Sequence, residues 1–464
     1  MKKINYIETD RLASAAEAKF GKYEYYLDFT AEALDDASAN RYGQRFWLIL
    51  LSGYVNTVLA HESQIAEAGF NGSRCLFHIS NNITRFSKRK IIANIKFAVR
   101  AFNSRQALRF AERQGKNASE VAIGDGVSLI SGAYLLPHFE VLPLTKKKDL
   151  NFRKKIDDLA QKQEDVIMKI ILLNLPMIWV EHLEYLVSKI KNLCAGIKTI
   201  HAERIYTHIE TLICAYSVSH GAELYYYQPG GHMGDLRYNK GLFSQLKKCD
   251  KFFTYGWEIN SKTVPGRALR LEKAAAHYAV NKKVTNFDIT YVLSVLSSKS
   301  RARYIRDLEA LIGVIDGESY GRQCLRPRGS TRWLPNSWDA RFLPRETRKQ
   351  LYIDRAQIPL TTLMGRSRLV LMLDHPSTGF LEAMYCRHPV MALIENRTSY
   401  SDLYQPILER FVDLGVCHYS TQSLAELLNK IDIGEWWNSV LGSEAFRTYD
   451  RLFLGGASRI GASD

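Results

Sequence analysis

Apolar and polar residues alternate along the chain in a pattern that predicts strands and helices in turn, most clearly within Arg368–Leu393. The apolar run Leu369–Leu373 has the length of a buried parallel strand. Pro376 ends this strand, because proline has no N–H group to give to the hydrogen-bonded ladder. A helix up to Arg387 with an apolar stripe follows, and Val390–Leu393 is apolar again. We therefore expect a strand–turn–helix–strand unit of a parallel sheet.

The start of this predicted helix carries groups that suit a phosphate. Ser377 and Thr378 each offer a hydroxyl, and Gly379 puts no side chain in the way of the helix N–H groups. Glu382 stands four residues after Thr378, so the two side chains share one helix face. By analogy with other nucleotide sites, that carboxylate could contact a ribose diol. Many turns of this kind in α/β proteins bind nothing, so a purely structural role is the alternative.

A glycine-rich turn between two predicted strands is the second feature of interest. The first strand is Glu223–Gln228, and the second, Phe252–Trp257, ends in a Gly-Trp pair. Between them lie Gly230, Gly231 and Gly234. Glycines allow a backbone to approach a ligand closely and to adopt positive φ. The turn is therefore a candidate ligand contact, although a glycine-rich turn alone is weak evidence.

The rest of the chain alternates in the same way, which favours an α/β fold with parallel sheets. Residues 22–68 are expected to be helical, and Ser261–Ala279 to be a connector. The other main predicted elements are the helix Met168–Lys191 with a break at Pro176, the strand Asp288–Leu293, the helix Ser300–Ile315, the strand Gln323–Leu325, the helix Tyr404–Leu414, the edge strand Val416–Tyr419 and a helix that ends near Leu454.

Arginines are dense in the second half of the chain. Ten of them fall between Arg322 and Arg368, and their guanidinium groups match phosphate and carboxylate oxygens two at a time. Arg326 and Arg328 are favoured as ligands because they follow a predicted strand, where open α/β sheets bind their ligands. A solvated basic face is the alternative for the group.

The composition is that of a globular protein with an unusual charge. The 464 residues are 46% hydrophobic and 24% charged, which suits two domains of ordinary size. The net charge of +15 favours an anionic partner, such as nucleotide phosphates, an acidic sugar, nucleic acid or an anionic membrane surface. Residues 86–100 form a basic amphipathic pattern that fits either a solvated face or a membrane-surface helix.

Cysteine usage and the longest apolar run bear on location. The seven cysteines are scattered and never spaced as C-x-x-C, which argues against a disulfide framework or a structural zinc site. The N-terminus lacks the apolar core of a signal peptide. The longest apolar run, Ile167–Val180, is too short and too interrupted to span a bilayer. We expect a cytoplasmic protein, with peripheral contact to the inner face of the cytoplasmic membrane as an open alternative.

The segment around Thr378 resembles a known motif. Asp374, His375, Ser377, Thr378, Glu382, Ala383 and Pro389 fit the pattern D-H-x-S/T-T-x-x-x-E-A-x-x-x-x-x-P. This pattern is similar to the donor-nucleotide motif in the C-terminal half of GT-B glycosyltransferases, especially bacterial surface-polysaccharide enzymes. The resemblance implies that His375, Ser377, Thr378, Gly379 and Glu382 bind the donor.

Other patches resemble a family of transferases encoded in O-antigen and related surface-glycan clusters. Residues 45–54 are similar to its R-Y/F-W-x-x-x-x-G-x-W/Y element, with Ser52 at the glycine position. Gln228 and the turn after it are similar to its Q-H-G-G-x-x-G turn, except that Pro229 stands at the histidine position and His232 follows three residues later. Asp432–Trp437 resembles its W-W and terminal-helix pattern. The resemblance extends over most of the chain, from Arg45 to Trp437, in separated patches.

The resemblance implies a GT-B-like fold: two Rossmann-like domains that face each other across a cleft, with a helix-rich N-terminal extension. The expected domains are an acceptor-side domain at residues 1–262, a nucleotide-sugar-binding domain at 263–435, and a last helix at 436–464 that crosses back to the first domain. The donor should lie on the second domain, with Arg326 and Arg328 at its phosphate. The Gly230–Asp235 turn should face it from the first domain.

The implied reaction is transfer of a sugar from a nucleotide-sugar. Asp235 and His232 are the candidate bases for the acceptor hydroxyl, with Asp125 a further choice. Neither a metal nor a cofactor is expected, since GT-B enzymes generally work without an essential metal.

The segment around Thr378 also resembles bacterial ulosonate and sialate transferases, and this resemblance, with the surplus of arginines, implies a CMP-activated ulosonic acid as the donor. UDP- and GDP-sugars, which enzymes of the same fold use, are the alternative. The expected acceptor is a surface glycan, a lipid-linked glycan or a protein. A teichoic-acid-like polyol-phosphate transferase and a non-catalytic GT-B-like protein remain alternatives. No nucleic-acid-binding motif is present.

Overall fold

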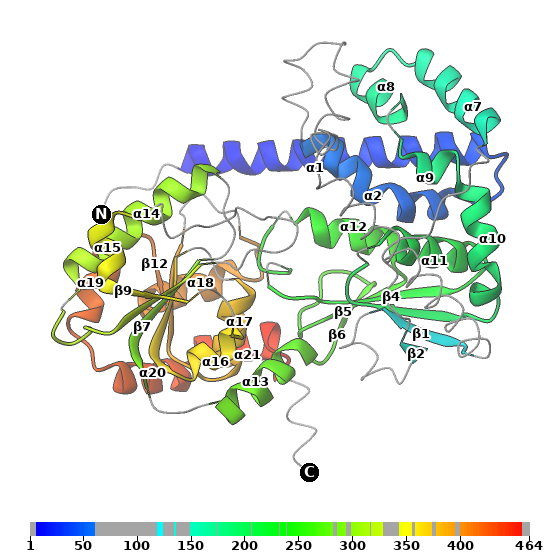
Figure 1. Cartoon of the computed structure of the whole chain (residues 1–464). Coiled ribbons are helices and arrows are strands. Elements are labelled where there is room, and N and C mark those ends of the chain that lie inside the picture. Colours follow the sequence, from blue (N-terminus) through cyan, green and yellow to red (C-terminus); the bar gives the residue numbers. More distant parts are fainter. Residues whose placement is uncertain are drawn as a thin grey trace, which may run out of the picture. The chain divides into compact units, whose positions relative to one another are not determined.

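A computed structural model gives the fold (Figure 1). It describes residues 6–60, 118–123, 134–135, 149–173, 175–205, 207–231, 233–237, 239–281, 285–293, 298–315, 317–327, 343–354, 358–373, 377–394 and 400–456. The chain divides into two compact units. The C-terminal unit comprises Met1–Ala13, Gln228–Asn239 and Phe253–Asp464, and the N-terminal unit comprises Ser14–Tyr227 and Lys240–Phe252.

The C-terminal unit is built on a six-stranded parallel sheet. Its strands are β7 (Phe287–Val292), β8 (Gln323–Arg326), β9 (Leu351–Ile353), β10 (Ser367–Met372), β11 (Val390–Leu393) and β12 (Cys417–His418). They lie side by side in the order β12-β11-β10-β7-β8-β9, and every neighbouring pair is parallel. Numbered from β7 as the first strand, this is the Rossmann order 3-2-1-4-5-6.

Helices cover both faces of this sheet because its strands are apolar on both sides. Leu369 and Leu371 of β10 belong to a buried cluster with Leu308 and Leu311 of α14 (Ser298–Val314) and with Leu424 of α19 (Thr421–Leu428). On the opposite face lie α16 (Leu360–Met364) and α17 (Thr378–Tyr385), as Figure 1 shows. Successive side chains of a strand point to opposite faces of the sheet. Because helices bury both faces, the central strands are largely apolar along their length.

The strand–turn–helix–strand unit predicted from the sequence is confirmed. The strand expected at Leu369–Leu373 is β10, the helix is α17, and the strand Val390–Leu393 is β11. The predicted edge strand at Val416–Tyr419 is β12, which lies at one edge of the sheet. The helix predicted at Tyr404–Leu414 is α18 (Gln405–Asp413).

The other sheet has the order β2-β1-β3-β4-β5-β6. Its strands are β1 (Glu120–Ile123), β2 (Tyr134–Leu135), β3 (Thr199–Ala202), β4 (Glu223–Tyr227), β5 (Lys251–Thr254) and β6 (Thr263–Pro265). The pairs β2–β1, β1–β3 and β3–β4 are parallel. The predicted α/β class with two parallel sheets is thus confirmed, and the boundaries at 262 and 435 and the cleft remain predictions.

Most of the other residues that the structure describes in the N-terminal unit are helical. These helices are α1 (Tyr6–Ala37), α2 (Gln44–Ala60), α7 (Leu150–Gln161), α8 (Val166–Leu173), α9 (Met177–Val180), α10 (Leu183–Cys194), α11 (His208–Ser219) and α12 (Lys240–Lys248). The first of them, α1, begins in the segment Met1–Ala13 of the C-terminal unit. The helical interpretation of residues 22–68 is confirmed as far as Ala60, with a break between α1 and α2 where Ala39 and Asn40 have positive φ. Phe46 and Trp47 are fully buried, so these aromatic residues pack in the core.

Two sequence interpretations are wrong in detail. The supposed connector Ser261–Ala279 contains β6 and the helix α13 (Leu269–Asn281). This helix has few buried positions, so it shows little apolar periodicity, and alanine and other strong helix formers stabilise it instead. The last helix is two helices, α20 (Ile433–Gly442) and α21 (Glu444–Phe453), because Ser443 accepts a hydrogen bond from Phe446 N and caps a new helix.

Among the helices in the part of the chain that the structure describes, none combines the length and the apolar character that crossing a bilayer requires. The basic segment at residues 86–100 lies outside the described residues.

Candidate functional site

The helix α17 begins at the topological switch point of the C-terminal sheet. The strands β7 and β10 are neighbours there, and the chain connects them outward to opposite edges of the sheet. Ligands of open α/β sheets bind outside the carboxyl ends of the strands at such a point. Ser377 occupies the N-cap position of α17, and its side chain makes no capping hydrogen bond. The Ser377 hydroxyl therefore does not cap the N–H groups at the start of α17 and can bond a ligand.

The glycine turn lies directly on this helix start. The amide of Gly231 donates a hydrogen bond to Thr378 Oγ1 at 3.0 Å. A side chain at Gly230 would place its Cβ 2.5 Å from Thr378 Oγ1, and one at Gly231 would place it 2.8 Å from Thr378 N. Neither glycine has positive φ. Gly231 lies against the backbone of Ser377 and Thr378, and Gly230 lies against the Thr378 side chain, so a larger residue at either position would require these neighbours to move.

Gly234 is needed for a different reason. Its φ is +88°, and a Cβ there would lie 2.6 Å from the Trp257 ring. The positive φ expected from the sequence is therefore observed at this one glycine of the turn. Trp257 is fully buried, so the ring forms a fixed wall under the turn.

Gln228 holds the turn in place. Its Nε2 donates to the carbonyl of Gly230 at 2.8 Å. Its Oε1 accepts hydrogen bonds from Tyr255 N at 3.0 Å and from Trp257 Nε1 at 2.9 Å. The side chain is 4% exposed. One buried amide thus joins the glycine turn to the Gly-Trp segment, which explains why the two features occur as a pair in the sequence.

Arg270 of α13 connects the turn to Glu382. Its Nη1 donates to the carbonyl of Pro229 at 3.0 Å, and its Nε lies 3.6 Å from Glu382 Oε1. Burial raises the pKa of Glu382, and the positive charges of Arg270 and Arg326 oppose that shift. Thr378 and Glu382 share a helix face as expected; Thr378 contacts the turn directly at Gly231, and Glu382 is connected to it through Arg270.

Arg326 is the last residue of β8, which extends one residue beyond the predicted strand, and it lies near Glu382, but its guanidinium already has partners. Its Nη1 donates to Asp354 Oδ2 at 2.7 Å and to the carbonyl of Ile358 at 2.8 Å. Asp354 is 5% exposed, so this is a buried ion pair. Contact between Arg326 and a donor phosphate stays a prediction.

Asp235 is buried beside aromatic residues. Its carbonyl accepts a hydrogen bond from Ser401 N at 2.8 Å, and Ser401 Oγ donates to the carbonyl of Gly234. Burial first, and the nearby Asp235 carboxylate second, raise the pKa of Tyr449 well above its ordinary value. The carboxylate therefore lies near Tyr449 of α21, and its role as a base stays a prediction.

Several predicted site residues lie outside the described residues: His232, Arg328 and His375, together with Asp125 and Asp374. Gly379 is described, and a Cβ there would lie 2.8 Å from Leu360 Cδ2. A side chain at Gly379 would thus crowd Leu360, and contact between Gly379 and the donor stays a prediction. The sequence pattern does not indicate Arg270, because the segment that carries it has too little apolar periodicity to predict the helix α13.

Together these groups could bind an oxyanion. The start of α17 presents backbone N–H groups and the Ser377 hydroxyl, and helix N-termini attract negative charge. Arg270 supplies a cation at the edge of the turn, and 39% of its side chain is exposed. Such an arrangement can hold a phosphate and stabilise charge that develops on it.

Comparison with known proteins gives a family match. A model of the LIC12162 family transferase matches residues 74–455. Among solved structures, the wall teichoic acid polymerase TagF has a TM-score of 0.34 at 11% identity, covering 58% of this chain and 71% of its own. The UDP-GlcNAc 2-epimerase from Neisseria meningitidis has a TM-score of 0.41 at 13% identity, and the match covers 73% of this chain and 87% of the epimerase. Trehalose-6-phosphate synthase has a TM-score of 0.40 at 12% identity, and the match covers 75% of this chain and 98% of the synthase. A search of curated proteins finds no match.

Proposed function

The chain belongs to the LIC12162 family of transferases, and from that premise we propose that it transfers a sugar from a nucleotide-sugar to a bacterial surface-glycan, lipid-linked or protein acceptor. The observation that carries the proposal is the contact between the glycine turn and the start of α17, at the switch point of a Rossmann-ordered sheet. That is a place where such sheets hold nucleotides, and the turn fixes the backbone at the helix end.

In this proposal the donor phosphate lies at the start of α17. The helix N–H groups and the Ser377 hydroxyl bind its oxygens, and Arg270 and Arg326 supply positive charge nearby. Glu382 is placed one turn along the same face for the ribose diol. When the sugar leaves, negative charge grows on the departing nucleotide, and fixed donors stabilise it without rearrangement. Asp235 and His232 are the proposed bases for the acceptor hydroxyl.

For the donor we propose a CMP-activated ulosonic acid. Such a sugar carries a carboxylate besides the phosphate, and the stretch from Arg322 to Arg368 holds more arginines than one phosphate would occupy. A polyol-phosphate transferase is the second candidate, since its nucleotide-linked donor presents the same phosphate chemistry to the start of α17.

A nucleotide panel tests the proposal. The melting temperature of the full chain is measured with CMP, UDP, GDP and dTDP, because a ligand that binds only the folded state stabilises it by about 2.7 kcal/mol at a hundredfold excess over Kd. CMP should raise the melting temperature most. A response to UDP or GDP without one to CMP would reject the ulosonic-acid donor and leave sugar transfer standing. No response to any nucleotide would reject the nucleotide-sugar proposal.

A further inference from the structure

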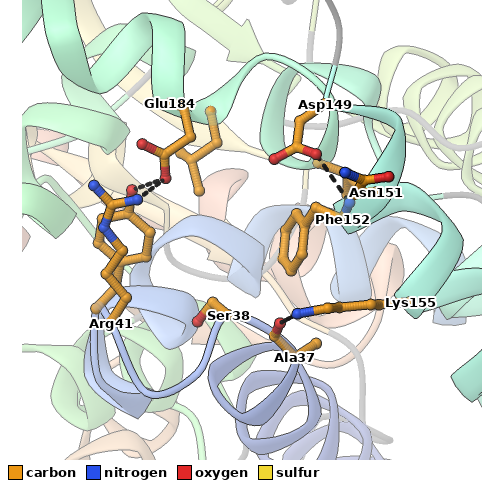
Figure 2. A pocket seen from close by; sticks show the side chains of 11 residues that line it. Ala37, Ser38, Arg41, Asp149, Asn151, Phe152, Lys155 and Glu184 are labelled. Atoms are coloured by element: carbon orange, nitrogen blue, oxygen red, sulfur yellow. Dashed lines mark hydrogen bonds and ion pairs between the residues drawn. The ribbon is translucent and has the colours of Figure 1, made fainter.

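The N-terminal unit contains a pocket that the proposed donor site does not use. It lies between the end of α1, the start of α7 and the start of α10, and has a volume of about 250 Å³ (Figure 2). At about 30 Å³ per water molecule, it has room for roughly eight waters, which is about the space that one monosaccharide fills. The pocket is partly open, so a unit of a longer chain could enter it.

The charges around this pocket cancel. Arg41 Nη1 donates to Glu184 Oε1 at 2.6 Å, and the hydroxyl of Tyr42 donates to the same oxygen at 2.6 Å. Burial first, and this hydrogen bond second, raise the pKa of Tyr42, so the phenol keeps its proton. On the other side, Asp149 Oδ1 accepts from Phe152 N at 3.0 Å as the N-cap of α7. An anionic ligand would therefore have to displace Glu184 from Arg41.

Lys155, the second cation in the pocket lining, also has a hydrogen-bond partner. Lys155 Nζ donates to the carbonyl of Ala37 at 3.3 Å, at the carboxyl end of α1. This position suits a cation, because a helix carries partial negative charge at that end. With two cations and two carboxylates, the lining has no net charge and gives no preference to a charged ligand.

The same lining keeps hydrogen-bonding capacity toward the pocket. A carboxylate can accept about four hydrogen bonds and a guanidinium can donate about five, and Glu184 and Arg41 use fewer than that in the contacts described. Asn151 is exposed at the rim and offers both donors and an acceptor. Figure 2 shows the Phe152 ring directed into the space between these polar groups. Trp47, with its ring centre 6.0 Å away, supports that ring from the core.

We propose that this pocket binds one uncharged sugar unit of the acceptor glycan. A sugar has an apolar face of C–H groups that packs on an aromatic ring and a rim of hydroxyls that both donate and accept. The neutral, polar and partly aromatic lining fits that chemistry and disfavours phosphate. The inference rests on the proposed function, because it names the binding site for the acceptor of that reaction.

The test uses saturation-transfer NMR on the full chain with neutral and anionic probes. The neutral probes are the methyl glycosides of glucose, galactose and mannose, and N-acetylglucosamine; the anionic probes are glycerol 3-phosphate and N-acetylneuraminic acid. At least one neutral sugar should receive saturation. Asn151→Trp, which fills the pocket from its exposed rim, should weaken that binding about tenfold or more, as expected for the loss of one or two hydrogen bonds. Lys154→Ala, on the exposed side of the same helix, should not.

The outcomes separate this inference from the proposed function. Nucleotide stabilisation should be the same in Asn151→Trp as in the wild type, which also shows that the variant is folded. If the wild type binds nucleotides but none of the neutral sugars, or if Asn151→Trp keeps full sugar binding, the pocket is not a sugar site. Binding of the anionic probes alone would likewise overturn the inference. If sugars bind in the pocket but no nucleotide binds the protein, the proposed function fails and the sugar site stands.

Discussion

The amide of Gly231 donates a hydrogen bond to the hydroxyl of Thr378, a residue 147 positions away in the chain. This contact brings together the two features that the sequence singled out, the glycine turn and the start of α17. The turn is further fixed by Gln228 and Arg270. The backbone at the helix end is therefore positioned by long-range contacts before any ligand arrives, which lowers the ordering cost of binding.

A methyl group at Gly231 should break this arrangement. In Gly231→Ala the Cβ would lie 2.8 Å from Thr378 N, so the turn must move away from α17. We expect the free energy of unfolding to fall by roughly 1–3 kcal/mol and nucleotide affinity to fall with it. Urea unfolding and calorimetry measure the two effects. Gly313→Ala is the matched control, because a Cβ at Gly313 of α14 would meet nothing within 4 Å; equal behaviour of the two variants would contradict the prediction.

Removing the Gln228 amide should cost stability. Gln228→Met keeps the approximate volume but leaves Trp257 Nε1, Tyr255 N and the carbonyl of Gly230 without this partner. Buried groups that lose their hydrogen bonds should lower the free energy of unfolding by roughly 2–4 kcal/mol. Chemical denaturation checks this, with the exposed Gln422→Met of α19 as the control. A loss below about 0.5 kcal/mol, the usual range for surface changes, would show that the amide does not hold the turn.

Lys248 should make stability depend on pH. Its Nζ donates to Ser52 Oγ at 2.9 Å, it is 8% exposed, and burial lowers its pKa to about 8 from 10.5. Between these values the unfolded chain binds more protons at this site, so the contribution of Lys248 to stability rises with pH. At pH 7 Lys248→Met should be the more stable form, and its advantage should shrink by roughly 2 kcal/mol by pH 9.5.

This difference is measured by urea unfolding of both proteins at each pH, so that the titration of other groups cancels. The control is Lys191→Met, which removes an exposed lysine of α10. An advantage of Lys248→Met that stays constant between pH 7 and pH 9.5 would show that the buried amine does not titrate in this range.

The guanidinium geometry of Arg270, which contacts two partners at once, should affect nucleotide affinity more than its charge does. Arg270→Lys keeps the positive charge but cannot reach both the carbonyl of Pro229 and the carboxylate of Glu382. We expect nucleotide affinity to fall about tenfold, equivalent to the loss of one hydrogen bond to a charged group. Arg267→Lys, three residues earlier on the same segment, is the control, because the exposed Arg267 pairs only with Glu272 in the contacts described. Equal nucleotide affinities of the two variants would show that Arg270 does not contribute to nucleotide binding.

The unit around α17 could be predicted from the sequence because the residues that specify it are close together in the chain. The apolar run of β10, the hydroxyl pair before the helix and the apolar β11 follow one another within 26 residues, Arg368–Leu393. Thr378 and Glu382 share a face because their spacing alone determines it. The central, buried strands were recognised for the same reason, since burial on both faces makes them uniformly apolar.

Contacts between distant segments could not be predicted in this way. Arg270 lies 41 residues from Pro229, and nothing in its neighbourhood marks it as part of a site. Arg326 stands at the end of β8, as the strand pattern predicts, but that pattern does not indicate that the buried Asp354 pairs with it. The position of Asp235 against the aromatic core near Tyr449 likewise depends on how α21 packs. These features arise from tertiary packing, which a strand or helix pattern does not encode.

The central claim is that the start of α17 binds the donor nucleotide, and calorimetry with CMP tests it most directly. The double variant Ser377→Ala/Thr378→Val is compared with the wild type and with Ser420→Ala/Thr421→Val, which removes the same two hydroxyls from the same positions of α19. Each hydroxyl that bonds a charged oxygen should contribute roughly 1.5–3 kcal/mol. We predict that the α17 variant binds CMP at least about tenfold more weakly while the α19 variant binds as the wild type does. Unchanged CMP affinity in the α17 variant would contradict the claim.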